Sequence, residues 1–248
     1  VLLTGLHEPD NRTIPTLTIK DVTFAILNYT YGPNYEIVSN KLASRMELLC
    51  ARNEQTGAMD YTTINPQVLE DIKTAKELAD IVVVCPHWGT EYQTSPSSYQ
   101  QKFARQMTEA GADLIIGAHP HVVQPIEQIQ TDNGNSSICY YSLGNYVSTQ
   151  QNGRSMLEGM AWVTYHVDQD GISLRQDKTG VIPLVCHYTS SPVRIQNIYP
   201  LEDYTQELAS SHGIISYGGI SFSLSDLQQW SAETFGDWVL TKDAALSN

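Results

Sequence analysis

The sequence of 248 residues lacks long hydrophobic runs, basic clusters and the common nucleotide-binding motifs. Its longest apolar run, residues 81–85, is far shorter than the ~20 residues that a membrane-spanning helix needs, so we expect no such segment. Lys and Arg number 14 against 27 Asp and Glu, which gives a net charge of −13 and argues against nucleic-acid binding. No G-x-x-x-x-G-K-[ST] loop, G-x-G-x-x-G turn or G-x-S-x-G elbow is present, which disfavours nucleotide binding by those routes and a serine hydrolase.

Cysteine is also scarce, and the four cysteines form no C-x-x-C pair. Cys85 and Cys139 lie in apolar segments, where we expect buried, reduced thiols. A chain of this length buries enough surface to fold without disulfides or a structural metal, so a bound metal would be functional. Because the chain is acidic, an anionic substrate would need a local attraction such as a metal ion.

Hydrophobic patterning predicts an α/β fold in which helices alternate with buried strands. We expect helices over residues 66–79, with Asn65 as N-cap, and over residues 96–110, with Gly111 at the end. The apolar segments 81–85 and 112–117 are predicted to be parallel neighbours in one sheet.

The remaining predicted elements are less regular. They are a hairpin of residues 16–19 and 22–31, a loop with a short element over 32–63, a strand over 138–142, a hairpin of 162–167 and 172–176, and helices over 202–210 and 225–239. The character of the sequence changes near residue 180, so we expect a core of residues 1–180 and a small C-terminal extension of residues 181–248.

Polar side chains follow the two buried strands, where open α/β sheets place their ligands. His87 follows the first strand, and His119 and His121 follow the second. In an extended backbone, residues two apart face the same side, and Pro120 stiffens this segment. We therefore predict that His87, His119 and His121 bind a divalent metal ion and form the catalytic centre.

Other polar residues near these strand ends are candidates for ligand binding. Glu91 either orients an imidazole or is an ordinary surface carboxylate. Gln124 follows His119 and His121. Ser142 and Asn145 end the third strand in a Gly-Asn turn that is either structural or functional. We include Glu91, Gln124, Ser142 and Asn145 as candidate ligand-binding residues.

Three motifs together resemble one known family. They are H-W-G-T-E-Y at residues 87–92, G-A-D-L-I-I-G-A-H-P-H at 111–121 and Y-S-L-G-N at 141–145. The segment of residues 81–147 is similar to the bacterial capsule synthesis proteins of the CapA-type poly-γ-glutamate biosynthesis family, whose fold is related to the calcineurin-like metallophosphoesterases.

The resemblance implies a layered α/β/β/α core and a divalent metal, either Mn, Zn, Fe or Mg. By this resemblance, His87, His119 and His121 match the late metal-binding positions of the family. Members also carry an upstream Gly-Asp motif and an Asn-Asn-His-x-x-Asp motif, neither of which occurs in this sequence. We therefore expect these motifs to precede Val1, and metal to bind weakly without them.

Three classes of function remain open on the sequence. The first is a metal-dependent, phosphoesterase-like hydrolase that acts on a phosphoester or an acidic polymer. The second is a non-catalytic protein that binds or assembles the polymer, and the third is an α/β domain with structural histidines. The resemblance favours capsule synthesis at the extracellular face of the cell envelope, with an N-terminal anchor outside this chain and membrane-bound synthesis proteins as partners.

Overall fold

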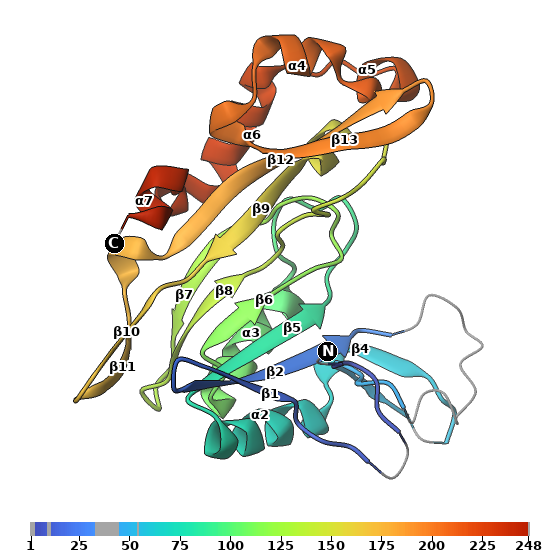
Figure 1. The fold of residues 1–248 in the computed structure, drawn as a ribbon. Helices are drawn as coiled ribbons and strands as arrows, with labels where there is room; N and C mark the ends of the chain where they lie inside the picture. The colour runs from blue at the N-terminus through green and yellow to red at the C-terminus, as the bar shows by residue number, and fades with distance from the viewer. Residues whose placement is uncertain (1–2, 9–10, 33–44, 54, 248) are drawn as a thin grey trace. The chain divides into compact units, whose positions relative to one another are not determined.

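The computed structural model describes residues 3–8, 11–32, 45–53 and 55–247, which form two compact units (Figure 1). The first unit comprises residues 1–90, 96–118 and 127–141. The second comprises Glu91–Ser95, His119–Ile126 and Ser142–Asn248. The two short segments of the second unit thus interrupt the chain of the first.

The first unit contains a six-stranded sheet in the order β1-β2-β5-β6-β8-β7. Its strands are β1 (Thr16–Ile19), β2 (Val22–Thr30), β5 (Ile81–His87), β6 (Leu114–Ile116), β7 (Ile126–Gln130) and β8 (Ser136–Tyr140). Strand β1 pairs antiparallel with β2, which confirms the predicted hairpin. Strands β2, β5, β6 and β8 are parallel, so the two buried segments are parallel neighbours as predicted.

Helices α2 (Pro66–Leu78) and α3 (Ser98–Ala110) pack against one face of this sheet. Asn65 caps α2 as predicted, because its side chain accepts a hydrogen bond from the free backbone N–H of Gln67. The sequence places the start of α3 two residues early, because Ser97 and Gln100 form a capping box there. Alternate residues of the strands and the apolar stripes of both helices form the core.

The ends of several strands differ from the prediction. Strand β5 includes Pro86 and His87, so His87 ends the strand instead of following it. Strand β8 ends at Tyr140, which places Ser142 beyond the strand. The expected loop of residues 32–63 contains an antiparallel hairpin of β3 (Cys50–Arg52) and β4 (Met59–Ile64), while residues 33–44 lie outside the described part.

The second unit contains a three-stranded sheet in the order β13-β12-β9 and a separate hairpin. Its strands are β9 (Leu157–Trp162), β10 (Tyr165–Asp168), β11 (Gly171–Leu174), β12 (Gly180–Ser190) and β13 (Val193–Pro200). The predicted hairpin is present as β10 and β11, but Trp162 belongs to β9, which pairs with β12. Strands β12 and β13 form a long antiparallel ribbon that the sequence did not predict.

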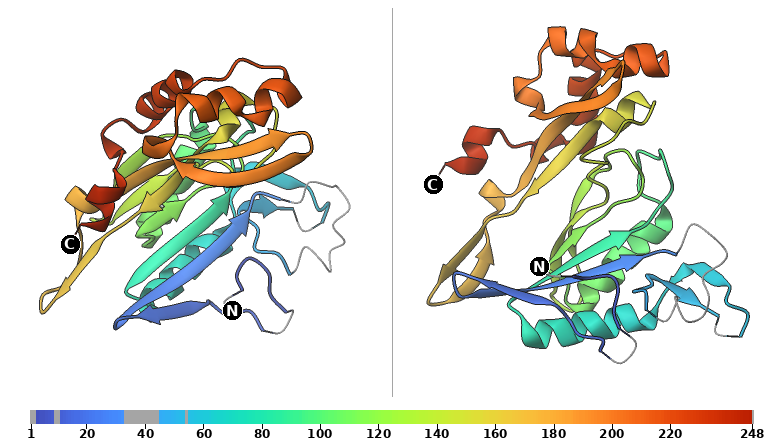
Figure 2. Two further views of the ribbon diagram at one scale, coloured as in Figure 1. Left: turned by 45° about the horizontal axis from the view of Figure 1, so that its top comes forward. Right: turned by 45° about the vertical axis from the view of Figure 1, so that its right-hand side comes forward.

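Short helices complete the second unit. They are α4 (Gln206–Ser211), α5 (Gly213–Gly218), α6 (Leu224–Phe235) and α7 (Lys242–Leu246), with single 3-10 turns at Gly153–Met156, Gln176–Lys178, Leu201–Asp203 and Gly236–Trp238. Helix α5 packs against β12 (Figure 2). The predicted helix at 202–210 begins later, after a 3-10 turn, and the predicted helix at 225–239 ends at Phe235.

The fold is therefore a mixed α/β fold with layered sheets and helices, as predicted. The division at residue 180 stays a prediction, although β12 begins there and pairs with β9 on the other side of it. All four cysteines are free thiols, and Cys139 is fully buried. Within the described part of the chain, no helix has the length and apolar character needed to cross a bilayer.

Candidate metal centre

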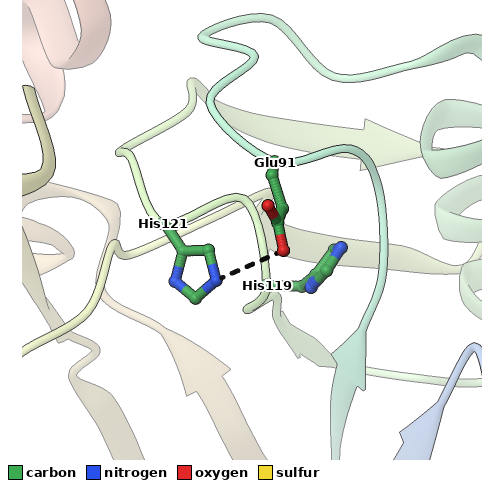
Figure 3. A group of neighbouring side chains, drawn as sticks. All are labelled: Glu91, His119 and His121. Carbon is green, nitrogen blue, oxygen red and sulfur yellow. Dashed lines mark ion pairs between the residues drawn. The ribbon is translucent and has the colours of Figure 1, made fainter. Parts of the chain in front are cut away.

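Three potential metal ligands converge in the second unit: Glu91, His119 and His121 (Figure 3). Each offers one ligand atom, and these atoms lie within 4.8 Å of one another. Nε2 of His121 is 3.9 Å from Oε1 of Glu91. The candidate centre therefore includes two of the three predicted histidines and the carboxylate for which the sequence left two interpretations.

The backbone that brings the two histidines together is not extended, so that part of the prediction is wrong. His119 has φ of 106° and His121 has φ of 60°, both in the left-handed region that residues with a Cβ avoid. The chain therefore turns on both sides of Pro120 instead of alternating as a strand would. The backbone N–H of Tyr92 donates to the carbonyl of Pro120 at 2.7 Å, and this bond joins the loop of Glu91 to the loop of the histidines.

Left-handed backbone is concentrated around this centre. In the described residues, six non-glycine residues have positive φ, and two of them form the tight turn between β1 and β2. The other four are Tyr92, His119, His121 and Tyr146. Such strain costs of order 1–3 kcal/mol for each residue and persists where surrounding contacts enforce it, which occurs most often at functional sites.

The ring of His121 is held in one orientation by Asn145. Nδ1 of His121 lies 2.7 Å from Oδ1 of Asn145. The amide nitrogen of Asn145 faces two acceptors, the carbonyl of His121 and Oε1 of Gln150, each at 3.3 Å, which assigns Oδ1 to the side of the imidazole. Nδ1 therefore carries a proton, and Nε2 is the ring nitrogen that faces Glu91. Asn145 positions a ligand in this arrangement, as outer residues of metal centres commonly do.

His119 is suited to ligation by its environment. Burial lowers the pKa of His119, as does the neighbouring His121, while Glu91 raises it. The lowered pKa favours the neutral ring of His119. A metal ion needs this form, because a protonated imidazole has no free lone pair.

The three groups fit a divalent transition metal by chemistry and by distance. Imidazole and carboxylate suit Zn²⁺, Mn²⁺ and Fe²⁺, and two such ligands, each about 2.1 Å from one ion, are at most about 4.2 Å apart. The separation of 3.9 Å between His121 and Glu91 already meets this limit. The three ligand atoms now lie within 4.8 Å of one another, and small side-chain rotations would bring all of them within this limiting distance. Three protein ligands leave coordination positions open.

Gln124 and Ser142 stabilise the loops beside the centre. The side chain of Gln124 is buried, and its amide nitrogen donates to the carbonyls of Gln93 at 2.8 Å and Ser95 at 3.2 Å. Its backbone N–H donates to the carbonyl of Ser142, whose hydroxyl accepts from the N–H of Gly144. A ligand-binding role for these two residues stays a prediction.

His87 ends β5 in the first unit. The ring of Tyr31 stacks on it with centroids 5.8 Å apart and planes 10° from parallel. Its role as a metal ligand also stays a prediction.

The sequence interpretation missed Glu158, which lies in β9 and is fully buried. Its Oε2 accepts hydrogen bonds from the backbone N–H groups of Asn145 and Tyr146. Burial raises the pKa of Glu158 to about 7, and these two N–H groups oppose the increase. An acid inside the apolar segment of residues 156–162 is the signal that could have found it.

In a comparison with known proteins, residues 4–150 match the family of the bacterial capsule synthesis protein PGA_cap. These residues include Asn145 and the three converging ligands. The chain belongs to this family. It is 42% identical over 124 residues to the PGA biosynthesis protein CapA of Bacillus subtilis (strain 168), over 50% of this chain and 30% of that protein. It is 39% identical over 139 residues to the capsule biosynthesis protein CapA of Bacillus anthracis, over 54% of this chain and 30% of that protein.

These matches confirm the predicted resemblance to CapA-type proteins. The chain spans about 30% of the length of each of these relatives. Glu158 lies outside the residues matched to the family, since it follows residue 150.

Proposed function

We propose that this chain acts in the synthesis of a capsule polymer, poly-γ-glutamate, and holds a divalent metal ion with Glu91, His119 and His121. The observation that carries this proposal is the convergence of the three ligand atoms within 4.8 Å on a strained backbone. Membership in the capsule synthesis family supplies the biological process.

The residues of the centre divide into ligands and supports. His121 presents Nε2 because Asn145 holds Nδ1, and burial favours the neutral form of His119 by lowering its pKa. A bound divalent ion would act there as a Lewis acid that polarises a phosphoryl or carbonyl oxygen. Because the chain carries a net charge of −13, a local cation would also attract an anionic polymer that the rest of the surface repels.

The exposure of the centre supports a polymeric substrate. The side chain of Glu91 is 53% exposed and that of His121 is 29% exposed, so a long chain can reach both. We propose hydrolysis of a phosphoester-like or polymer bond as the activity, with binding of the polymer without chemistry as the alternative. We also propose that the protein acts at the extracellular face of the cell envelope with membrane-bound synthesis proteins, which the family's role in capsule synthesis supports.

Calorimetric titration of the 248-residue chain with Mn²⁺ and Zn²⁺ tests the metal centre. We expect His119→Ala and Glu91→Gln to weaken binding by at least tenfold, because each removes a ligand. His166→Ala is the matched control, since His166 is an exposed histidine in β10 that pairs with Asp168. Equal affinity for the wild type and both ligand variants would refute the site.

Two further measurements separate the remaining alternatives. His87→Ala weakens binding by a similar factor if His87 is a ligand, and leaves it unchanged if it is not. Turnover of an aryl phosphate and of poly-γ-glutamate, abolished in His119→Ala, would establish hydrolysis. Metal-dependent retention of poly-γ-glutamate without turnover would instead establish binding.

A further inference from the structure

Glu158 is an unusual group to find inside the second unit. Its side chain is fully buried, and Oε1 has no hydrogen-bond partner among the described residues. A carboxyl group in such a place is costly, and an apolar residue of similar volume would pack there at no such cost. Its presence therefore calls for a role other than stability.

The only contacts that use the charge of Glu158 in the described structure go to the turn of residues 144–146. Oε2 accepts from the N–H groups of Asn145 and Tyr146, the second at 2.8 Å. Gly144 has φ of 78°, and a Cβ on it would lie 2.4 Å from Oε2. The carboxylate therefore packs directly against the turn, and Tyr146 is held in a left-handed conformation with φ of 60°.

This turn carries the residue that orients a metal ligand. The side chain of Asn145 holds Nδ1 of His121 at 2.7 Å, and its backbone N–H is held by Glu158. If the turn moves, Oδ1 of Asn145 moves with it and no longer selects Nδ1 of His121 as the nitrogen that carries the proton.

We propose that Glu158 is a positioning residue of the metal centre, which fixes Asn145 through its backbone and so keeps His121 protonated at Nδ1 with Nε2 open to the metal. Its effect on metal affinity rests on the proposed function. Its effect on the proton of His121 does not, because that proton is in place before any ion binds. The two can therefore be tested apart.

Nitrogen-15 NMR of His121 in the metal-free, full 248-residue chain at pH 8 measures the tautomer directly. We expect the wild type to carry the proton at Nδ1. Glu158→Asp shortens the side chain by one methylene and loses its reach to both N–H groups, so we expect His121 to become a mixture of tautomers. Glu158→Gln keeps an oxygen that accepts both bonds, and we expect it to restore the Nδ1 proton.

Gly144→Ala is a second change, because its Cβ would lie 2.4 Å from Oε2 of Glu158 and 3.1 Å from the carbonyl oxygen of Leu157, at a φ of 78° that alanine rarely adopts, and would therefore separate the turn from the carboxylate. It keeps the test valid should Glu158→Asp fail to fold. Leu157→Val is the matched control for loss of packing, since Leu157 is buried in the same strand but presents no carboxylate to the turn. We expect this control to lower the melting temperature without changing the tautomer.

Titration with Mn²⁺ completes the test. We expect Glu158→Asp and Gly144→Ala to weaken binding about tenfold and Leu157→Val to change it less than twofold. Retention of the Nδ1 proton in both Glu158→Asp and Gly144→Ala, or an equal tautomer change in Leu157→Val, overturns the inference. A wild type with the Nδ1 proton that binds no metal refutes the proposed function and leaves the positioning of His121 supported.

Discussion

Protonation of His212 is expected to lower the stability of the second unit in mild acid. His212 is 1% exposed and caps α5, where its Nδ1 accepts from the N–H of Ile214 at 3.0 Å. Its Nε2–H donates to the carbonyl of Cys186 at 2.9 Å. A proton on Nδ1 would replace this acceptor with a donor that faces another donor. The folded protein therefore requires the neutral ring.

The magnitude follows from the pKa of this group. Burial lowers the pKa of His212 from 6.5 to about 4, an effect that the hydrogen bond to Cys186 opposes and the nearby His187 reinforces. Because the pKa of His212 is lower in the folded protein than in the unfolded one, the contribution of His212 to the free energy of unfolding is fully present above pH 6.5. It falls as the pH decreases towards 4, by about 3 kcal/mol in total.

The titration of Glu158 changes the free energy of unfolding in the opposite direction over an overlapping pH range. Burial raises its pKa from 4.5 to about 7, so its contribution to stability is present below pH 4.5 and is lost as the pH rises to 7. The pH dependence of the free energy of unfolding of the wild type therefore contains contributions from both His212 and Glu158. A difference between the wild type and a variant of His212 isolates the histidine.

His212→Asn is the suitable variant, because asparagine also caps a helix through its side-chain oxygen but does not titrate. Urea unfolding of both proteins at pH 7.5, 6.5, 5.5 and 4.5 gives the free energy of unfolding at each pH. We expect the variant to be less stable by about 1 kcal/mol at pH 7.5, through loss of one good hydrogen bond, and more stable than the wild type at pH 4.5. Parallel curves for the two proteins would refute this account of His212.

Two further predictions concern the first unit and use the same urea assay at pH 7.5. Ser97→Ala removes the capping box with Gln100 and should lower the free energy of unfolding by about 1 kcal/mol, and a change below a few tenths would contradict the role of this cap. Arg12→Met leaves the buried carboxylate of Asp71, among the described residues, with only the neutral donors Tyr29 and Gln67. This change should cost about 2 kcal/mol, less than breaking a fully buried pair, because Arg12 is 31% exposed. A variant as stable as the wild type would show that Asp71 is satisfied without its cation.

The first unit was largely predictable because its signals are local. A run of β-branched residues predicted β5, and Asn65 followed by Pro66 marked the start of α2, since the cap and the fixed φ of proline act within one turn. Gly111 marked the end of α3 through its left-handed conformation, with φ of 114°.

The ribbon of β12 and β13 was missed because its sequence carries conflicting signals. Pro183 and Pro200 are typical strand breakers, yet both lie in strands, Pro183 opposite Gly159 and Pro200 opposite Leu184. A proline removes one donor from the ladder, and the other paired residues of this ribbon keep the strands together. Pairing across the chain therefore outweighs local propensity here.

The site was predictable in composition but not in geometry. Two histidines around Pro120 indicated ligands, yet the sequence does not mark a left-handed backbone at His119 or His121, since histidine adopts positive φ more often than most residues with a Cβ but still does so rarely. That conformation depends on contacts between distant segments, such as the bond from Tyr92 to Pro120. Glu158 is separated from the turn that it holds by 12 or more residues, so its role depends on the folded chain.

The four left-handed residues around the candidate centre also affect how this protein can change under selection. At Tyr92, His119, His121 and Tyr146, glycine would adopt the observed backbone without the steric penalty that a Cβ brings. A laboratory selection for heat resistance alone would therefore favour glycine at these positions and remove two of the three candidate ligands. The proposed metal binding would oppose the substitutions at His119 and His121, so selection for stability and selection for metal binding would favour different residues at these two positions.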